Sequence, residues 1–271
     1  MTGVEWRLAD GLALREVEPV QYTPSESEEI ALTWQSALAA NPNLFDGPIV
    51  AARSLSWDGA TCRVDWSAGT YSQYLWRRAS GPAVGRRFAR ALFASVLPVT
   101  TDGRVVLGRM GAATSTPGRV QLPGGNVDVP PSGALLTEAA VRAEAVRELA
   151  EETGLALRPD EVTLWAVKTG GDHGDIGIIF GAPPRDATEL RAIFTRHHRQ
   201  LTLAGGHPEF VSLLAASHHP PQNDDPPSNN LRPYVDYVPE LLRAALGNGA
   251  LTVQEWPATA NEHKEEYHVR D

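Results

Sequence analysis

Arg147-Glu148-Leu149-Ala150-Glu151-Glu152-Thr153-Gly154-Leu155 is the stretch that decides how this chain folds and which chemistry it carries. It forms the end of a helical pattern that begins near Leu136 or Thr137. Gly154 ends that helix, because glycine adopts the left-handed conformation that commonly follows the last turn. Apolar residues line the other face and predict that the helix packs against a sheet: Ala140, Val141, Ala145, Val146 and Leu149.

The carboxylates of this helix form one stripe. Glu148 lies one turn from both Glu151 and Glu152, and Glu144 lies one turn before Glu148. Like charges so close together repel unless a cation or a proton lies among them, and hard oxygen ligands favour Mg²⁺, with Mn²⁺ as the alternative. The competing interpretation is an exposed acidic helix face. The Gly-Gly turn before the helix and the glycine at its end favour the metal site.

The composition is that of a folded protein with little attraction for nucleic acid. Hydrophobic residues make up 42% of the 271 residues and charged residues 21%, so a substantial core can form. The formal net charge of −9 provides no basic excess to displace the counterions of nucleic acid. The single cysteine, Cys62, cannot form an intrachain disulfide. No apolar run is long enough to cross a bilayer, and charges interrupt the N-terminus, so we expect a cytoplasmic protein that binds neither nucleic acid nor membrane.

Residues 1–85 are expected to form a small N-terminal α+β extension with a boundary at Gly81-Pro82. Its predicted elements are helices at Pro24 to Ala40 and Tyr71 to Arg78 and strands at Ile49 to Trp57 and Cys62 to Trp66. Residues 86–260 are expected to form the main domain, and 261–271 a polar tail.

In the main domain, Phe88 to Pro98 and Val105 to Arg109 are predicted strands, and Thr101-Asp102-Gly103 between them predicts a hairpin. Pro123-Gly124-Gly125 is predicted as a turn. The other predictions are strands at Val120 to Leu122, Leu164 to Val167, Ile176 to Phe180 and Phe210 to Ala215, helices at Glu189 to Leu201 and Pro239 to Leu246, and a proline-rich loop at His218 to Asn230.

Arg147 to Leu155 resembles the second half of the Nudix box, G-x5-E-x7-R-E-U-x-E-E-x-G-U, in which U is aliphatic. Gln121 to Gly125 is similar to the strand and turn that lead into that box. The resemblance implies an α+β fold, built as an α/β/α sandwich with a mixed sheet, and metal-dependent hydrolysis of a phosphoanhydride. By matching position, the divalent-metal ligands would be Glu148, Glu151 and Glu152, with Arg147 orienting the cluster.

The first half of the box departs from the pattern. Counting back from Arg147 puts Gly133 at the motif glycine but Ala139 at the motif glutamate. The second alignment takes Gly125 as the motif glycine and the residues after it as an expanded loop. We prefer the second alignment, because it keeps the Gly-Gly turn attached to its strand.

Further site candidates lie around the box. Under the preferred alignment, Glu138 and Glu144 are candidates for the missing acidic role, and Glu144, an additional candidate metal ligand, can reach Arg147. Both are alternatively surface charges, which is the preferred interpretation for Glu138. Glu209 follows a glycine-containing loop where an additional acidic group could act in catalysis. The candidate substrate-binding residues are Gly124, Gly125, Arg109 and Arg119. The arginines, and Arg104 with them, are alternatively solvated charges.

Polar residues elsewhere are given a structural interpretation. Asp172, His173 and Asp175 could contact phosphate or ribose, but a solvent-exposed turn is preferred. The histidine pairs at 197–198 and 218–219 lack partners at zinc spacing, so they are interpreted as surface residues.

A second resemblance concerns the N-terminal region. Asn43 to Pro48, followed by a two-stranded piece and Thr70 to Tyr74, is similar to a Nudix subfamily that hydrolyses UDP-glucose and UDP-galactose. That subfamily also has an expanded loop after Pro-Gly-Gly. The likeness implies a nucleotide-sugar substrate, with UMP and a sugar 1-phosphate as products. The alternatives are a Nudix hydrolase of ADP-ribose or a nucleoside triphosphate, and a non-catalytic Nudix-fold binding or regulatory domain, which Ala139 favours. By analogy with the family, a homodimer is a further expectation.

Overall fold

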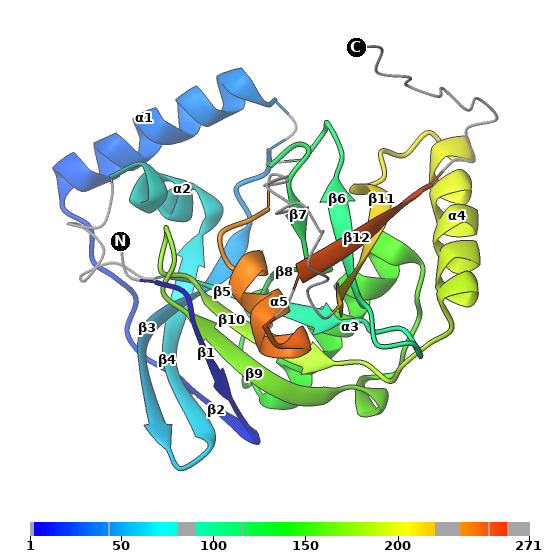
Figure 1. Cartoon of the computed structure of the whole chain (residues 1–271). Helices are drawn as coiled ribbons and strands as arrows, with labels where there is room; N and C mark the ends of the chain where they lie inside the picture. Colours follow the sequence, from blue (N-terminus) through cyan, green and yellow to red (C-terminus); the bar gives the residue numbers. More distant parts are fainter. Residues whose placement is uncertain are drawn as a thin grey trace.

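The computed structural model describes residues 3–42, 44–80, 90–114, 116–219, 234–248 and 250–258. Figure 1 shows the described strands in the middle of the molecule, with helices around them. The strands are β1 Glu5–Leu8, β2 Gly11–Glu16, β3 Pro48–Asp58, β4 Thr61–Thr70, β5 Arg90–Leu97, β6 Val105–Met110, β7 Val120–Gln121, β8 Gly124–Asn126, β9 Thr163–Thr169, β10 Ile176–Gly181, β11 Phe210–His219 and β12 Ala250–Pro257. The helices are α1 Pro24–Ala40, α2 Tyr71–Ser80, α3 Glu138–Thr153, α4 Ala187–Leu203 and α5 Val238–Leu246, together with a 3-10 turn at Pro159–Glu161.

The described strands form two sheets. The larger has the order β1-β9-β10-β5-β3-β4-β2, and β8 pairs with β5 outside this path. In it, β10 pairs with β5 and β2 with β4 in parallel, whereas the other pairs are antiparallel. The smaller sheet is antiparallel, with the order β12-β11-β6-β7. The predicted α+β class with a mixed sheet is therefore confirmed.

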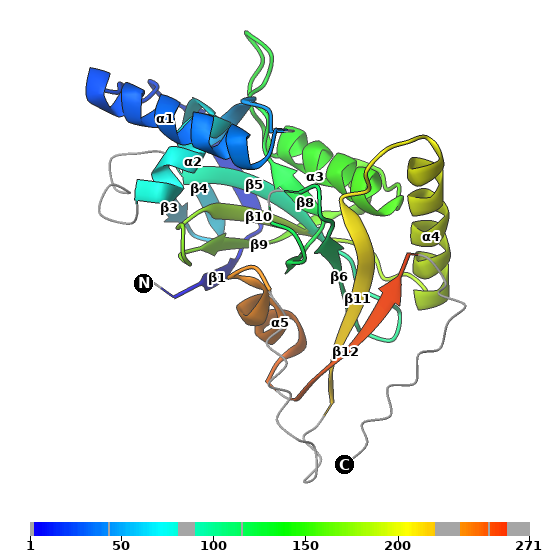
Figure 2. The same cartoon turned by 90° about the horizontal axis from the view of Figure 1, so that it is seen from above.

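Helices cover both sides of the larger sheet. Figures 1 and 2 show α3 on one side of β5 and β10 and α5 on the other. α3 contacts β5 and β8 through the apolar face predicted from the sequence. Val141, Ala145 and Leu149 are all fully buried there, which stabilises the packing by removing apolar surface from water. This packing fixes the end of α3, where the carboxylates lie.

The N-terminal segment continues the larger sheet. Ala51 and Ala52 of β3 pair with Ala91 and Arg90 of β5, and β1 pairs with β9 along its whole length. Above these strands, α1 packs on α2. The expected boundary at residues 81–82 lies outside the described residues, and the division into an extension, a main domain and a tail stays a prediction.

Several local predictions are corrected by pairings between distant segments. The hairpin around 101–103 does not join β5 and β6: β5 pairs with β3, β8 and β10, and β6 pairs with β7 and β11. A bridge between Val99 and Val105, together with backbone hydrogen bonds from Thr100 to Arg104 and from Val106 to Pro98, closes that turn. Gly124 and Gly125, predicted as part of a turn, belong to β8 because they pair with Ser95 and Ala94. Strands β1, β2 and β12 were not predicted, since their partners are far away in the sequence.

The other predicted elements are present with shifted ends. The helix at 24–40 is confirmed as α1, and β11 runs to His219, four residues beyond its prediction and into the predicted loop. Residues 43, 88–89, 220–230 and 261–271, on which other predictions fall, lie outside the described residues.

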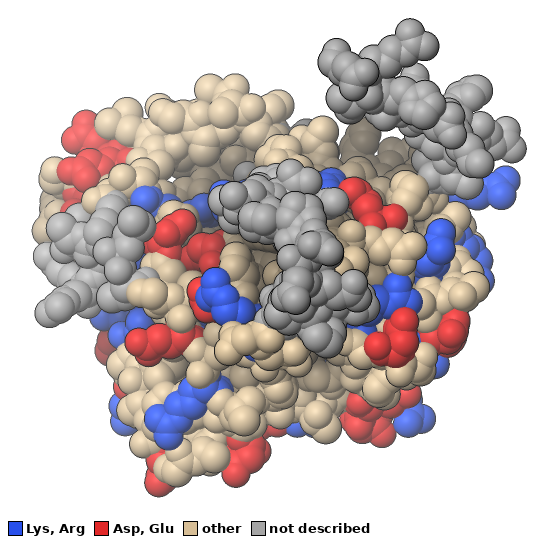
Figure 3. Space-filling view, viewed as in Figure 1, with Lys and Arg blue, Asp and Glu red and all other residues tan. Residues whose placement is uncertain are grey.

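In the described part of the chain, no helix is both long and apolar enough to cross a membrane. On the face that Figure 3 shows, acidic and basic side chains are interspersed among uncharged ones.

Candidate functional site

Helix α3 is capped at both ends, which fixes the residues of its last turn. The side chain of Thr137 accepts a hydrogen bond from the backbone N of Ala140 at 3.2 Å, as expected of an N-cap. At the other end, Gly154 has a φ of 77°. A Cβ there would lie 2.5 Å from the Cβ of His197, so glycine is required by both backbone conformation and packing.

Two glycines of β8 bring backbone against the carboxylates of α3. Gly124 has a φ of 151°, and a Cβ on it would lie 2.3 Å from the carbonyl oxygen of Ala94. Its backbone N donates a hydrogen bond of 2.8 Å to Glu152. A Cβ on Gly125 would lie 2.9 Å from the carboxyl carbon of Glu148. The absence of a side chain at Gly125 therefore lets β8 and the end of α3 approach each other, and its absence at Gly124 lets β8 lie close to β5.

The carboxylates of Glu148, which is partly buried, and Glu152, which is buried, lie close to Glu209. Burial, followed by the charges of Glu151 and Glu209, raises the pKa of Glu148 to about 7, against the opposing effect of Arg147. Glu152 is only 4% exposed, and burial together with Glu209 and Glu148 raises its pKa well above the ordinary value. Both shifts show that the site disfavours several negative charges unless a cation compensates them.

Arg147 holds the more exposed carboxylates. It contacts Glu144, Glu148 and Glu151, each at 2.7 Å, so the predicted orienting contact with the cluster is present. The side chain of Glu151 is 57% exposed. Because Glu151 follows Glu148 by three residues and Glu152 follows it by four, the two diverge around the helix, one toward solvent and one toward the core.

The structure therefore brings together only part of the predicted ligand set. Glu148, Glu152 and Glu209 influence one another electrostatically, whereas Glu151 faces solvent and Arg147. Among the described residues, no three His, Cys, Asp or Glu side chains are arranged so that they could hold a metal ion. The chemistry of the inner carboxylates fits a hard divalent cation, because they supply oxygen donors whose mutual repulsion a cation would relieve.

Glu138 has a structural contact. Its carboxylate accepts a hydrogen bond of 3.0 Å from the backbone N of Leu12 and also binds Arg142. It thereby ties the start of α3 to β2. The interpretation as a simple surface charge is corrected, since the side chain is 24% exposed and pairs with the N-terminal segment.

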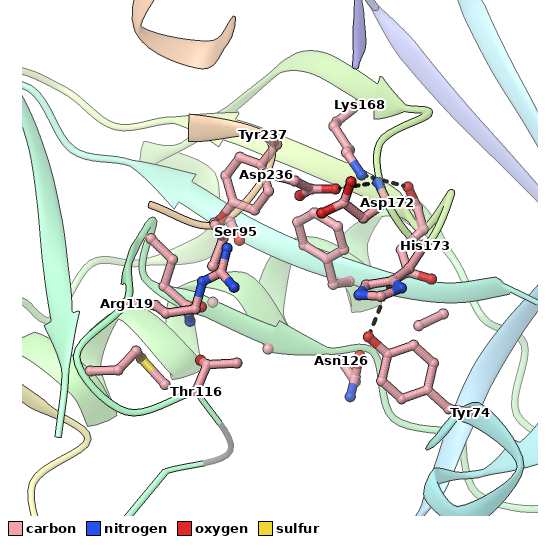
Figure 4. Close-up of a pocket in the computed structure, with 18 of the residues that line it drawn as sticks. Tyr74, Ser95, Thr116, Arg119, Asn126, Lys168, Asp172, His173, Asp236 and Tyr237 are labelled. Carbon is pink, nitrogen blue, oxygen red and sulfur yellow. Dashed lines mark hydrogen bonds between the residues drawn. The ribbon is translucent and has the colours of Figure 1, made fainter. Parts of the chain in front are cut away.

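A cavity of about 360 Å³ opens beside these carboxylates. The lining residues come from segments far apart in the sequence, namely α2, β5, β8, α3, the loop between β9 and β10, and residues 235–237. Of the predicted site residues, Gly124, Gly125, Glu148, Glu209 and Arg119 line it. Figure 4 shows Arg119 on one side of the cavity, near Ser95 and Tyr237.

The predicted arginines have different surroundings. Arg119 donates a hydrogen bond of 2.6 Å to the carbonyl oxygen of Tyr234, and its Nε is buried without a hydrogen-bond partner. Arg109 is not among the residues that line this cavity, and it binds Glu255 at 2.8 Å. Arg104 pairs with Asp102 in a different part of the surface. Of the three, the structure places only Arg119 beside the carboxylates.

The loop between β9 and β10 is solvent-exposed only in part: Asp172 is exposed, His173 is partly buried and Asp175 is buried. Asp172, His173 and Asp175 line the cavity, and Asp175 is only 8% exposed. Asp175 binds Arg77 of α2 at 2.9 Å, and Lys168 donates hydrogen bonds to the carbonyl oxygens of Gly170 and Asp175. Burial lowers the pKa of both Lys168 and His173.

The sequence analysis missed the part of the cavity that α2 provides. Tyr71, Tyr74 and Arg78 line it, as do Phe93 of β5 and Tyr237 just before α5. The i, i+3, i+7 spacing of the α2 residues is a signal that they share a helix face. That spacing could not show what the face would meet.

Comparisons with known proteins give only partial likenesses. No protein-family model matches the chain, and no curated protein matches it. Among solved structures, it is similar to a MutT/nudix family protein from Enterococcus faecalis, with 18% identity and a TM-score of 0.26, covering 35% of this chain and 38% of that one. It is also similar to a MutT protein from Methanosarcina mazei Go1, with 19% identity and a TM-score of 0.26, covering 41% and 94%. A NUDIX hydrolase from Nitrosomonas europaea has 14% identity and a TM-score of 0.21, covering 44% and 93%.

Proposed function

We propose that the protein is a Nudix hydrolase that cleaves a phosphoanhydride bond in a nucleoside diphosphate linked to another group. The observation that carries the proposal is the convergence of Glu148, Glu152 and Glu209 beside the glycines of β8. Glu148 and Glu209 line a cavity large enough for a small molecule, and Glu152 is close enough to be influenced by both. The match of residues 147–155 to the Nudix box supports the same chemistry.

The inner carboxylates are assigned the role of holding a divalent cation, Mg²⁺ or Mn²⁺. Glu148, Glu152 and Glu209 would bind it once their side chains draw together, since no three such side chains of the described residues are arranged to hold a metal ion. Glu151 and Glu144 would keep Arg147 in place on the outer side. When bound, such an ion neutralises phosphate charge and makes water a better nucleophile. This assignment replaces Glu151 by Glu209, because Glu209 lines the cavity and Glu151 does not.

The remaining tasks of hydrolysis fall to residues of the cavity wall. Arg119, with its unpartnered buried Nε, is suited to bind phosphate oxygens. Gly125 leaves room for a phosphate to approach the carboxylates, since a Cβ there would lie against the carboxyl group of Glu148. Gly124 lines the same cavity. A carboxylate oxygen that is not engaged with the ion would accept the proton of the attacking water.

For the substrate, we propose a UDP-sugar, cleaved to UMP and a sugar 1-phosphate. The support is the similarity of residues 43–48 and 70–74 to the UDP-sugar-hydrolysing subfamily, together with the expanded loop after Gly125. A UDP-sugar would place charged phosphates next to Arg119 and uncharged groups at both ends of the cavity. ADP-ribose and nucleoside triphosphates are the alternatives.

A substrate panel tests the proposed function. UDP-glucose, UDP-galactose, ADP-ribose and UTP are incubated with the full chain in Mg²⁺ and in EDTA, and products are separated by anion-exchange chromatography. We expect UMP and hexose 1-phosphate to appear with Mg²⁺ and to be absent with EDTA. Hydrolysis of ADP-ribose or UTP alone would overturn the substrate assignment.

A second candidate is a non-catalytic binding domain. It is favoured by the contacts of Arg147, which holds Glu148 and Glu151 at 2.7 Å, and by Ala139 in place of the motif glutamate. The same substrate panel distinguishes the hydrolase from the binding domain. A protein that binds one of the nucleotides in calorimetry but hydrolyses none of them with Mg²⁺ or Mn²⁺ would establish this candidate and refute the enzyme.

A further inference from the structure

One face of α2 forms a side of the cavity. Tyr71, Tyr74 and Arg78 share that face, and all three line the cavity. The guanidinium of Arg78 lies 5.3 Å from the centre of the Tyr74 ring and 3.0 Å from Nε2 of His173. Figure 4 shows Tyr74 and His173 together on the side of the cavity away from Arg119.

Buried contacts hold this face of α2 in position. Asp175 binds the guanidinium of Arg77 at 2.9 Å and accepts a hydrogen bond of 3.0 Å from the hydroxyl of Tyr74. The side chains of Arg77 and Asp175 are 8% and 12% exposed. Because both ends of this contact are buried, the α2 face is formed before any ligand binds.

Phe93 supplies a further aromatic surface of the same cavity. Its ring stacks on Tyr237 with centres 5.6 Å apart and an angle of 25° between the planes. Behind it lies Gly177, where a Cβ would come within 2.4 Å of the Phe93 ring. Tyr237 therefore packs against the ring, and the missing side chain at Gly177 leaves room for it. Phe93 still lines the cavity.

The strand register places this surface at a defined position relative to the carboxylates. Phe93 pairs with Asn126, and Ser95 pairs with Gly124, whose N binds Glu152. Phe93 and Ser95 are two residues apart, which corresponds to about 7 Å along a strand. A phosphate held near Gly124 thus lies about one sugar ring away from the aromatic surface.

We propose that Phe93 and the α2 face formed by Tyr71, Tyr74 and Arg78 are the subsite for the nucleobase of the substrate. Aromatic rings bind the flat face of a base by stacking, and Arg78 and Asn126 offer hydrogen-bond donors to its edge. The inference rests on the proposed function, because that function places the phosphates of the substrate near Glu148. It assigns base recognition to the N-terminal segment, to which α2 belongs.

Equilibrium binding of monophosphates tests this subsite without depending on catalysis. UMP, CMP, AMP, GMP, ribose 5-phosphate and glucose 1-phosphate contain no phosphoanhydride bond, so titration calorimetry of the full chain with Mg²⁺ measures binding alone. We expect at least one nucleotide to bind about tenfold more tightly than ribose 5-phosphate. Phe93→Leu and Arg78→Gln should each remove most of that preference and leave the affinity for ribose 5-phosphate unchanged.

Arg158→Gln is the matched control, because its side chain is 74% exposed and distant from the cavity lining; it should retain the full preference. Thermal melting establishes whether each variant is folded. If Phe93→Leu does not fold, Arg78→Gln alone tests the base preference. Equal affinity for ribose 5-phosphate and all four nucleotides, or no binding of any of them, would overturn the proposal. So would a loss of glucose 1-phosphate affinity in Arg78→Gln without loss of nucleotide affinity. A base preference without any hydrolysis would support the subsite while refuting the proposed activity.

Discussion

Glu152 combines burial, negative charge and a hydrogen bond from backbone in one side chain. It is 4% exposed, and the backbone N of Gly124 is the partner that the structure provides for it at 2.8 Å. Nearby Glu209 and Glu148 add to the cost of its charge. A protein retains such a carboxylate at a cost in stability, which is typical of functional sites.

Replacement of Glu152 by Gln should separate stability from activity. The amide oxygen of Gln can still accept the hydrogen bond from Gly124, and loss of a buried charge removes repulsion. We expect an unchanged or higher melting temperature, with turnover of the best panel substrate lowered by about two orders of magnitude or more. Glu189→Gln, at an exposed position of α4, is the matched control. Wild-type turnover in Glu152→Gln would refute the catalytic assignment.

A second prediction at the scale of the residue concerns Gly124. Gly124→Ala places a Cβ 2.3 Å from the Ala94 carbonyl oxygen in a backbone conformation that other residues rarely adopt. We expect a loss of more than about 2 kcal/mol in the free energy of unfolding, measured by urea denaturation. Gly103→Ala is the control, because it has a φ of 80° but open space around it, and it should lose about 1 kcal/mol. Equal losses would show that the contact with Ala94 is relieved by small movements.

At the scale of the element, buried contacts join helix α2 to the loop between β9 and β10. Arg77 and Asp175 form a buried ion pair between them, Tyr74 shares Asp175, and Arg77 also donates to the carbonyl oxygen of His173. Removal of one partner leaves the other charge buried without compensation. The position of the α2 face therefore depends on a contact between residues about a hundred positions apart in the sequence.

Asp175→Asn tests this unit. We expect a loss of about 3 kcal/mol or more in the free energy of unfolding, because the guanidinium of Arg77 stays buried. Substrate KM should rise as well, since the α2 side of the cavity is no longer fixed. Glu189→Gln removes an exposed pair with Arg185 and should cost less than about 1 kcal/mol. Similar losses in the two variants would contradict the structural role of Asp175.

At the scale of the whole molecule, the cavity depends on the meeting of N-terminal, central and C-terminal segments. α2 closes one side, β5 and β8 form the floor, α3 brings Glu148, and residues 235–237 complete the wall. β3 and β1 join the N-terminal segment to the sheet that carries this floor. A ligand bound in the cavity therefore contacts elements whose relative positions exist only in the folded chain.

Mg²⁺ should accordingly stabilise the folded protein. Binding to the folded state alone raises the free energy of unfolding by about 2.7 kcal/mol when the ion is at a hundred times its Kd, and differential scanning calorimetry measures the resulting rise in melting temperature. The double variant Glu148→Gln/Glu152→Gln should lose this rise, and Glu189→Gln should keep it. The same rise in the double variant would place the ion elsewhere.

The sequence by itself determined the strongest local features. The approximate start of α3, its end at Gly154 and its apolar face follow from spacing and residue type, because a helix is stabilised by neighbours in the sequence. The box pattern also singled out Glu148 and Glu152 and the glycines at 124 and 125. These predictions needed no knowledge of distant segments.

Only the tertiary structure decided which of these residues face one another. Strand pairing turned the predicted Gly-Gly turn into β8, assigned β5 and β6 to different sheets, and brought Tyr74, Arg78 and His173 to one cavity. It also showed that Glu151 faces solvent and that Glu209 lies near Glu148. The physical reason is that strand partners and buried contacts are chosen by packing between segments far apart in the chain, for which a local pattern contains no information.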